Sequence, residues 1–520
     1  MILTHTLRYA RSWIMSEELL TEKYDELLNG VLECYDRVII VGHLGPLSYA
    51  QGMTNYLYGQ QIRIFDYTKF AEPLRDEIKG RMTEIATENG LKIEYIGKKR
   101  WRKEDRIKEI IKERGEEPGI VHIFSALERC KSYKPWYDKG QGKAYLKKDT
   151  GKCLHYYVYF IDEDYGLCYL RIPTWCPFRL QFYCNGHSWL AQQLKQTGIE
   201  FELMDNAFVD IADFDVANQL AAQFDPKVLH AKLDELAQRY CPVVKTVNLT
   251  YRWSIMQAEF ATDLVFKCQE ELQAFYPHLL ETLIHAVKPV NIATFLGRKL
   301  HSNYQDEMGN RFNVRHLGSC IRHQMGPVSI KMYDKFSLIL RIETTVNDVS
   351  FFQQYRQVHH RHGQTSTKWA PMLKSIYSLP ALRECLVAAH RRYLKFISAI
   401  ETPEFGLQQL QQVTETQTDN NRRYKGFNLL TEADAFLLRT LLRGEFAVTG
   451  LTNKALRQLL PDKNSGQVSR LLKRLRVHGL LKKVGKHYKY HLTNLGRQIA
   501  TMALKLREMY VIPTLAQTSA

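Results

Sequence analysis

The sequence predicts a multi-domain protein of mixed α/β and α+β class, with an N-terminal parallel α/β layer, a central body of mixed strands and helices, and a small C-terminal domain of helices and a hairpin. Three observations lead to this prediction. Short apolar runs alternate with charged amphipathic stretches near the start, aromatic-rich segments follow, and a basic helical stretch precedes two short strand-like runs near the end. The 520 residues suffice for roughly three domains, because a typical domain holds ~150 residues.

The first expected domain spans residues 1–130. Charged amphipathic stretches in it predict helices, and one of these ends at the Asn89-Gly90 pair. Strict alternation of strands and helices favours a parallel sheet that is covered on both faces. The apolar runs that predict the strands lie at 36–42, 62–67, 91–97 and 119–127.

The second expected domain, residues 131–400, changes character. Dense aromatic residues predict antiparallel strands, with a hairpin turn at Asp162–Gly166. The pattern is helical from about 220 to 300 and again from about 366 to 400. Between these helical parts, Pro327–Asp348 predicts two strands around a polar break.

A polar connector and a C-terminal domain complete the predicted organisation. Residues 401–426 are rich in Gln, Thr and Asn and poor in apolar residues, which is typical of a connector. Residues 427–520 predict three helices, a hairpin and a final helix. The apolar residues of the third helix are spaced to share one face, and they are Val468, Leu471, Leu472 and Leu475.

The charge balance points to a polyanionic partner. The chain holds 72 Lys and Arg against 55 Asp and Glu, a net charge of +17, and such an excess favours nucleic acid over a membrane. Between Lys454 and Arg507 there are fourteen Lys and Arg and a single acid, Asp462. The excess is therefore concentrated in the C-terminal domain, as a surface that neutralises a phosphate backbone requires.

Several side chains of this domain are expected to contact DNA. The third helix directs a polar face away from its core, and Gln and Arg on such a face can read base edges in a major groove. Basic residues at the hairpin suit phosphates or the minor groove. The expected DNA-binding residues are Gln467, Arg470, Lys473, Arg474, Lys486, His487 and Lys489. A dimerisation or protein-docking module with a solvated basic face is the alternative.

The order of elements and the charge of residues 427–510 resemble the winged helix-turn-helix of MarR- and ArsR-like bacterial regulators. The resemblance implies a winged-helix fold and contact with double-stranded DNA. In MarR-like proteins the terminal helices form a dimer, whereas the apolar stripe of the last helix here can equally pack on the chain's own body. The whole chain also resembles long bacterial proteins labelled MarR-family regulators, and its body of over 400 residues departs from ordinary members.

A second resemblance concerns the body. The segment Ile330–Thr345, "IKMYDKFSLILRIETT", resembles the Tyr-Asp-Lys and Arg-x-Glu signature of rolling-circle replication initiators of plasmids and filamentous phage. The resemblance implies that Glu343 is a ligand of Mg²⁺ or Mn²⁺, and that Tyr333, Asp334 and Lys335 flank a catalytic site. The alternative is a structural hairpin in which Arg341 and Glu343 pair with neighbouring side chains.

Two other stretches suit metal or nucleic acid. In "QVHHRHG", His360 and His362 share a strand face and can hold one metal, although a surface histidine cluster is the alternative. The stretch Ser132–Lys152 interleaves aromatic residues with lysines, a composition that can stack single-stranded bases and neutralise phosphates, or simply form a solvated loop.

The sequence leaves two function classes open. Ten scattered cysteines without a CxxC pair favour a reduced, cytoplasmic protein, and neither a signal peptide nor a membrane span is expected. In the first class the protein is a DNA-binding transcriptional regulator whose body senses a ligand or partner, with a homodimer as one possible state. In the second it is a metal-dependent DNA-processing enzyme of nuclease, transposase or replication-initiator type, as mobile elements encode.

Overall fold

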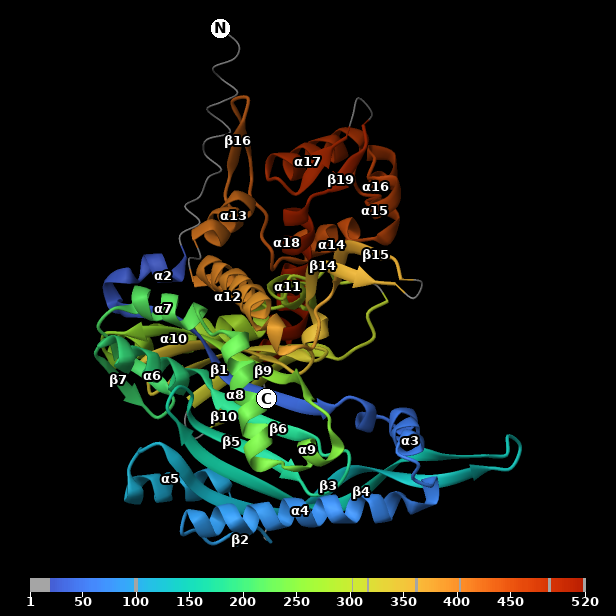
Figure 1. Cartoon of the computed structure of the whole chain (residues 1–520). Coiled ribbons are helices and arrows are strands. Elements are labelled where there is room, and N and C mark those ends of the chain that lie inside the picture. The colour runs from blue at the N-terminus through green and yellow to red at the C-terminus, as the bar shows by residue number, and fades with distance from the viewer. Residues whose placement is uncertain are drawn as a thin grey trace. The chain divides into compact units, whose positions relative to one another are not determined.

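The computed structural model divides into two compact units, Met1–Ile400 and Glu401–Ala520 (Figure 1). Both units contain helices and strands, so the mixed α/β class is confirmed. Among the described helices, none combines the length and apolar character that a membrane span needs. The structure describes residues 19–97, 102–301, 303–315, 318–360, 363–401, 404–484 and 488–517.

The first unit is built on one 11-stranded sheet with the order β10-β11-β12-β13-β9-β1-β6-β5-β4-β3-β2. The two long strands β1 and β9 pair antiparallel at its centre. The strands are β1 (Leu28–Leu44), β2 (Glu94–Tyr95), β3 (Gly119–Asp138), β4 (Lys143–Asp162), β5 (Gly166–Pro173), β6 (Leu180–Asn185), β9 (Tyr251–Phe266), β10 (Met308–Arg315), β11 (Gly318–Met325), β12 (Val328–Lys335) and β13 (Ile339–Val346).

The predicted parallel N-terminal layer is wrong. Within the described part of the chain, β2 and β3 form the one parallel pair, and β1 pairs antiparallel with β6 and β9. The run at 62–67 is not a strand, because it forms the 3-10 turn η4 (Ile64–Asp66) and the start of α4 (Tyr67–Glu88). Apolar periodicity indicates which segments are extended, but the partners of β1 lie far along the chain and leave no local pattern.

The expected boundary at residue 130 needs the same correction, because it falls inside β3. This strand and β4 form one long hairpin that continues into the Ser132–Lys152 stretch, and the pairing runs from Gly119 with Ile161 to Asp138 with Lys143. The hairpin turn expected at Asp162–Gly166 is confirmed, since it joins β4 to β5.

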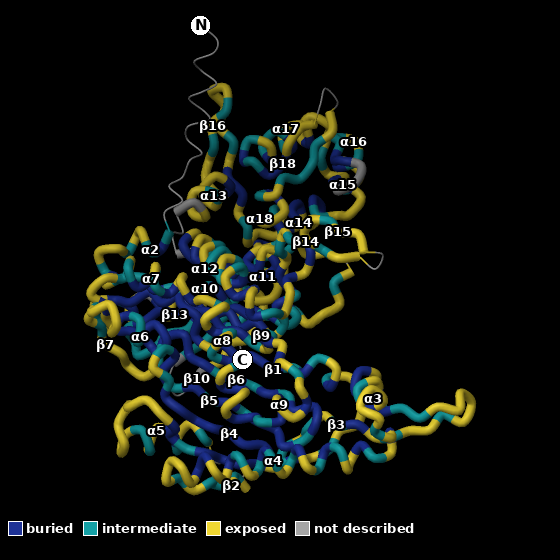
Figure 2. Tube along the Cα trace, viewed as in Figure 1, coloured by how far each residue is buried: buried dark blue, intermediate teal, exposed yellow. Residues whose placement is uncertain are grey.

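Most helices of the unit pack on one face of the sheet, and the strands between them are largely buried (Figure 2). The covering helices that contribute most to this core are α3 (Ala50–Gly59), α4, α8 (Pro226–Tyr240), α10 (Gln269–Ala286) and α12 (Leu379–Glu401). Strand residues alternate, so Ile123, Phe182 and Ile342 enter this core while their neighbours face the other way.

The second face of the sheet, called here the polar face, is covered by smaller elements. Helix α5 (Lys103–Arg114) packs through Ile107 against Phe124 and Tyr157. The hairpin of β7 (Phe201–Met204) and β8 (Ala207–Ile211) contributes to a small cluster with Val265 and Ile339. Between α5 and the β7–β8 hairpin, the polar face carries polar side chains of the central strands. The remaining α-helices and strands of the unit are α2 (Leu20–Lys23), α6 (Gly186–Thr197), α7 (Phe214–Ala222), α9 (Val243–Val247), α11 (Pro289–Phe295), β14 (Gln353–His359) and β15 (Thr365–Pro371).

The second unit has its own core, in which Leu438, Val468, Leu472 and Leu475 are buried. Helix α17 (Ser465–Val477) therefore buries the face that the sequence predicted, with Leu471 half-buried at the edge of that face. The elements are α13 (Glu404–Thr414), β16 (Gln417–Asp419), β17 (Arg422–Tyr424), α14 (Glu432–Leu441), α15 (Gly444–Thr449), α16 (Asn453–Leu459), α17 (Ser465–Val477), β18 (Leu481–Lys483), β19 (Tyr490–Leu492), α18 (Asn494–Lys505), η7 (Leu506–Val511) and α19 (Ile512–Gln517).

Residues 401–426 are more than the polar connector that their composition suggested. They carry α13 and the β16–β17 hairpin, and Val413 is fully buried in the core of the second unit beside Phe427. The many Gln residues of α13 lie on its outer side, so a single apolar residue anchors the segment and the average composition hides it.

Candidate functional site

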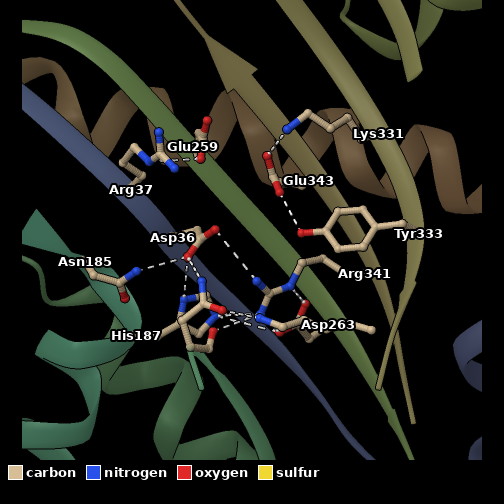
Figure 3. A network of polar contacts seen from close by, with 12 residues as sticks. Asp36, Arg37, Asn185, His187, Glu259, Asp263, Lys331, Tyr333, Arg341 and Glu343 are labelled. Atoms are coloured by element: carbon tan, nitrogen blue, oxygen red, sulfur yellow. Dashed lines mark hydrogen bonds and ion pairs between the residues drawn. The ribbon is translucent and has the colours of Figure 1, made fainter. Parts of the chain in front are cut away.

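Adjacent strands bring together part of the motif at 330–345. In the β12–β13 register Lys331 lies opposite Glu343, and Tyr333 lies opposite Arg341. The Tyr333 hydroxyl donates a hydrogen bond to Glu343 Oε2 at 2.8 Å, and Lys331 Nζ lies 2.5 Å from Oε1 (Figure 3). Glu343 is buried, whereas Tyr333 and Lys331 are half-buried, so the cluster lies at the border of the polar face and solvent.

This cluster has the form of a nucleophile beside a base. Burial, together with the negative charge of Glu343, raises the pKa of Tyr333, so the hydroxyl keeps its proton. A second carboxylate, Glu259 on β9, has its pKa raised by burial and by Glu343, and Arg37 lies 3.4 Å from it. The arrangement holds a tyrosine hydroxyl and an ammonium on the two oxygens of one buried carboxylate.

Asp334 and Lys335 do not join this cluster. The pKa of Asp334 is raised by burial, against the hydrogen bonds of Ser337. The Lys335 ammonium donates to the side-chain carbonyl of Asn206, which lies between β7 and β8. Burial, with the nearby charge of Arg341, lowers the pKa of Lys335 to about 8. Tyr333 and Glu343 of the sequence motif therefore meet directly, and the two residues after Tyr333 serve other contacts.

Arg341 is the centre of a second, fully buried polar cluster. Its guanidinium donates to both carboxylate oxygens of Asp263, at 2.6 and 2.5 Å. Arg341 Nη1 lies 3.7 Å from Asp36 Oδ2, and His187 Nδ1 lies 3.3 Å from Asp36 Oδ1. Asn185 donates its side-chain amide to Asp36 as well, at 3.2 Å. Figure 3 shows that these side chains come from β1, β6, β9, β13 and α6 and converge on one point.

Further contacts tie His187 and Asp263 into this cluster. Arg341 Nη2 lies 3.3 Å from His187 Nε2, and the same ring nitrogen lies 3.7 Å from Asp263 Oδ2. Burial raises the pKa of Asp263, but the charge and hydrogen bonds of Arg341 outweigh burial and lower it to about 2. The cluster therefore holds two carboxylates and one guanidinium, with Lys335 as the nearest further cation.

Sequence patterns did not identify Asp36, His187 and Asp263. A signal was present, because Asp36 and Asp263 stand in otherwise apolar strand runs, "CYDRVIIVG" and "FATDLVF", and buried carboxylates need partners. A register shift between Tyr35 and Arg37 in the β1–β9 pairing marks the bulge that contains Asp36.

Glu343 and His360, the predicted metal ligands that the structure describes, have separate contacts. Across the described residues, no group of three or more His, Cys, Asp or Glu is arranged to hold a metal ion. The oxygens of Glu343 are engaged by Lys331 and Tyr333, whereas His360 is exposed and contacts the Ser366 hydroxyl at 2.8 Å. His362 lies outside the described residues.

Helix α17 presents a polar face in the second unit. Asn464 and Gln467 form a capping box at its start, and Gln467, Arg470 and Arg476 are exposed. Lys473 forms an ion pair with Asp419 of β16. These contacts leave Arg470 and Arg476 as the exposed cations of the helix.

Arg474 has a structural environment instead. It donates to the backbone carbonyls of Lys425 and Gly426 at 2.7 and 2.6 Å, and its guanidinium lies 3.8 Å from the ring centroid of Phe427. The expectation that Arg474 faces a ligand is therefore corrected, because the segment before α14 folds back over it.

The hairpin after α17 adds further exposed cations. Lys482, Lys483 and Lys489 are exposed, and Lys483 Nζ lies 4.3 Å from the ring centroid of Tyr488. Lys486 and His487, which were expected to contact DNA, lie outside the described residues.

Comparisons of this chain with protein-family models, with curated proteins and with solved structures found no match.

Proposed function

We propose that this chain is a DNA-binding protein whose second unit contacts duplex DNA as a winged helix-turn-helix. The observation that carries the proposal is helix α17. Its apolar face is buried in the core of the unit, and Gln467, Arg470 and Arg476 are exposed on the remaining surface. A helix of this kind fits the major groove, where Arg and Gln can bond to base edges.

The elements around α17 support the same proposal. Helix α16 precedes it across a short turn, and the β18–β19 hairpin follows it, which is the order of a winged helix. A bridge between Leu451 and Tyr490 ties the hairpin to the segment before α16. The exposed Lys482, Lys483 and Lys489 then serve as wing contacts to phosphates. In this proposal the protein is a transcriptional regulator, and the first unit is a sensing or partner-binding body.

The test uses the full chain and a labelled duplex library. Arg470→Ala removes an exposed cation of α17, and Lys505→Ala, on the exposed side of α18, is the matched control. We expect Arg470→Ala to cost on the order of 1–3 kcal/mol of binding free energy and to relax the sequence preference at one position. Equal effects of the two variants on affinity and preference would remove the basis for placing α17 in the groove.

A DNA-processing enzyme is the second candidate, and the Tyr333–Glu343 contact favours it. A tyrosine hydroxyl that donates to a buried carboxylate is suited to attack a phosphodiester, with Lys331 near the developing charge. In this proposal, single-stranded DNA is nicked in the presence of Mg²⁺ or Mn²⁺, and Tyr333→Phe and Glu343→Gln abolish nicking while duplex binding persists. A wild-type protein that leaves single- and double-stranded DNA intact with either metal rejects the enzyme and leaves the regulator.

A further inference from the structure

A cavity of about 380 Å³ opens on the polar face of the sheet. None of the residues that line it belongs to β12 or β13, the strands of the Tyr333–Glu343 cluster. Its walls combine three cations with aromatic and apolar side chains. They are Val41, Lys103, Glu128, Tyr157, Tyr169, Arg171, Arg179, Leu180, Gln181 and Met256.

One of the three cations is already neutralised. Arg171 Nη2 lies 2.6 Å from Glu128 Oε2, and its Nε donates to the Tyr157 hydroxyl at 3.0 Å. Tyr157 in turn donates to Glu128 Oε1 at 2.6 Å. Glu128, the one carboxylate of the lining, is therefore held by Arg171 and Tyr157.

The other two cations form no ion pair among the described residues, and Lys103 feels the charges of Glu128 and Glu104 only at longer range. Arg179 Nε is buried and has no hydrogen-bond partner, and among the described residues no ion pair reaches its guanidinium. Lys103 Nζ lies 3.3 Å from the ring centroid of Tyr157. Lys103, Arg171 and Arg179 set against Glu128 leave an excess of two positive charges in the cavity, and such an excess is unfavourable unless an anion enters.

Neighbouring groups respond to the same positive charge. Burial and the charge of Arg171 lower the pKa of Arg179. Burial, followed by the charges of Arg179 and Lys131, lowers the pKa of His43 to about 4. Burial and then Arg171 lower the pKa of His155 to about 4 as well. After burial, the positive charges of the cavity and its surroundings are therefore the next cause of the lowered pKa of all three groups.

The remaining wall suits a flat aromatic group. Tyr169 stacks on Tyr183 with ring centroids 5.0 Å apart and an angle of 4° between the rings, and its hydroxyl accepts a hydrogen bond from Gln181. Both rings are half-buried, and Met256, which is 44% exposed, forms the rim. Tyr159 lies on the other side of Tyr169, with ring centroids 5.2 Å apart, so the cavity wall is the border of a row of three tyrosines against which a base can pack.

We propose that this cavity binds a nucleotide, with the phosphate at Arg179, Arg171 and Lys103 and the base against Tyr169 and Met256. Guanidinium groups match phosphate oxygens with paired hydrogen bonds, and the volume lies in the range of small-molecule sites. The nucleotide is either free or a unit of a single-stranded nucleic acid, because the cavity recognises the same phosphate and base in both.

The test compares wild type, Arg179→Ala and Lys112→Ala as full-length chains. Because the Arg179 guanidinium has no partner in the described structure, its removal should leave the thermal midpoint unchanged or raised. Lys112, exposed on the same helix as Lys103, is the matched control. Binding of AMP is measured by calorimetry, and binding of a fluorescein-labelled ten-residue oligo-dT by anisotropy.

We expect at least one probe to bind wild type, Arg179→Ala to weaken that binding about tenfold, and Lys112→Ala to change it by less than twofold. AMP that binds and displaces the oligonucleotide identifies a free nucleotide as the ligand, and oligo-dT binding without AMP binding identifies a unit of a strand. Failure of both probes to bind, or equal binding by wild type and Arg179→Ala, overturns the proposal. Duplex binding through α17 is measured on the same proteins and is expected to be unaffected, so the two proposals fail separately.

Discussion

Replacing Arg341 tests the buried polar cluster most severely. Arg341 is fully buried and donates twice to Asp263, which is itself 1% exposed. Arg341→Met keeps the length of the side chain but leaves Asp263 and the buried Asp36 without their guanidinium. Breaking a buried ion pair from one side costs on the order of 3–5 kcal/mol, because an uncompensated charge remains.

The pKa of Asp263 gives a second measure of the same contact. Its ordinary value is 3.8, and the folded chain holds it at about 2, a difference worth about 2 kcal/mol. Because the folded pKa is the lower one, this stabilisation is present above pH 3.8 and is lost as pH falls through 2. The variant should lose that dependence on pH in this window.

The assay is urea unfolding of full-length chains, followed by fluorescence for the first unit. We expect the first-unit transition of Arg341→Met to move to lower urea. The double variant Arg341→Met/Asp263→Leu should recover part of the loss, because it removes the unpaired carboxylate together with its partner. Asp263→Leu alone is measured as well, and if the losses of the two single variants simply add in the double variant, the ion pair is not the origin of the loss and the reasoning is refuted.

Three other outcomes follow from single contacts. Lys335 has a folded pKa of about 8, whereas its ordinary value is 10.5. Unfolding therefore takes up protons between these two pH values, and the free energy of unfolding should rise with pH from about 8 to 10.5. A series of urea titrations at different pH should show this rise for the wild type and not for Lys335→Met. Arg474→Ala should cost on the order of 1–3 kcal/mol of stability in the second unit, because the contacts with two backbone carbonyls and with Phe427 are lost. The base preference in a selection experiment should not change. An altered preference at normal stability would contradict the structural role of Arg474. Val413→Ala should lower the stability of the second unit by about 2 kcal/mol in thermal unfolding, because Val413 is fully buried there. An unchanged stability would mean that residues 401–426 are a connector and not part of the core.

The sequence predicted what depends on local periodicity. The spacing of Val468, Leu472 and Leu475 indicated the buried face of α17, and that face is buried. The alternation along β13 likewise put Arg341 and Glu343 on one side of the strand, away from Ile342. In both cases the side chain's direction follows from its position in a regular element.

Contacts between distant segments could not be predicted in this way. The Asp36, His187 and Asp263 side chains meet only because β1 pairs with both β6 and β9, and apolar patterns do not specify strand partners. The position of Arg474 on its helix is equally compatible with a DNA contact in the sequence alone. In the fold, its guanidinium donates to the backbone carbonyls of Lys425 and Gly426 instead. Arg179 offered no pattern, since its significance is the lack of a partner in a three-dimensional cavity.

Duplex binding by the second unit alone tests the central claim most directly. Since Val413 belongs to its core, the fragment begins at Glu401 and ends at Ala520. The described exposed cations of α17 and the hairpin are five, namely Arg470, Arg476, Lys482, Lys483 and Lys489. If each contacts a phosphate or a base beside one, a plot of log affinity against log salt concentration should have a slope of about −4 to −5. A folded fragment that binds no duplex DNA at low salt, or binds with a slope near zero, would contradict the account.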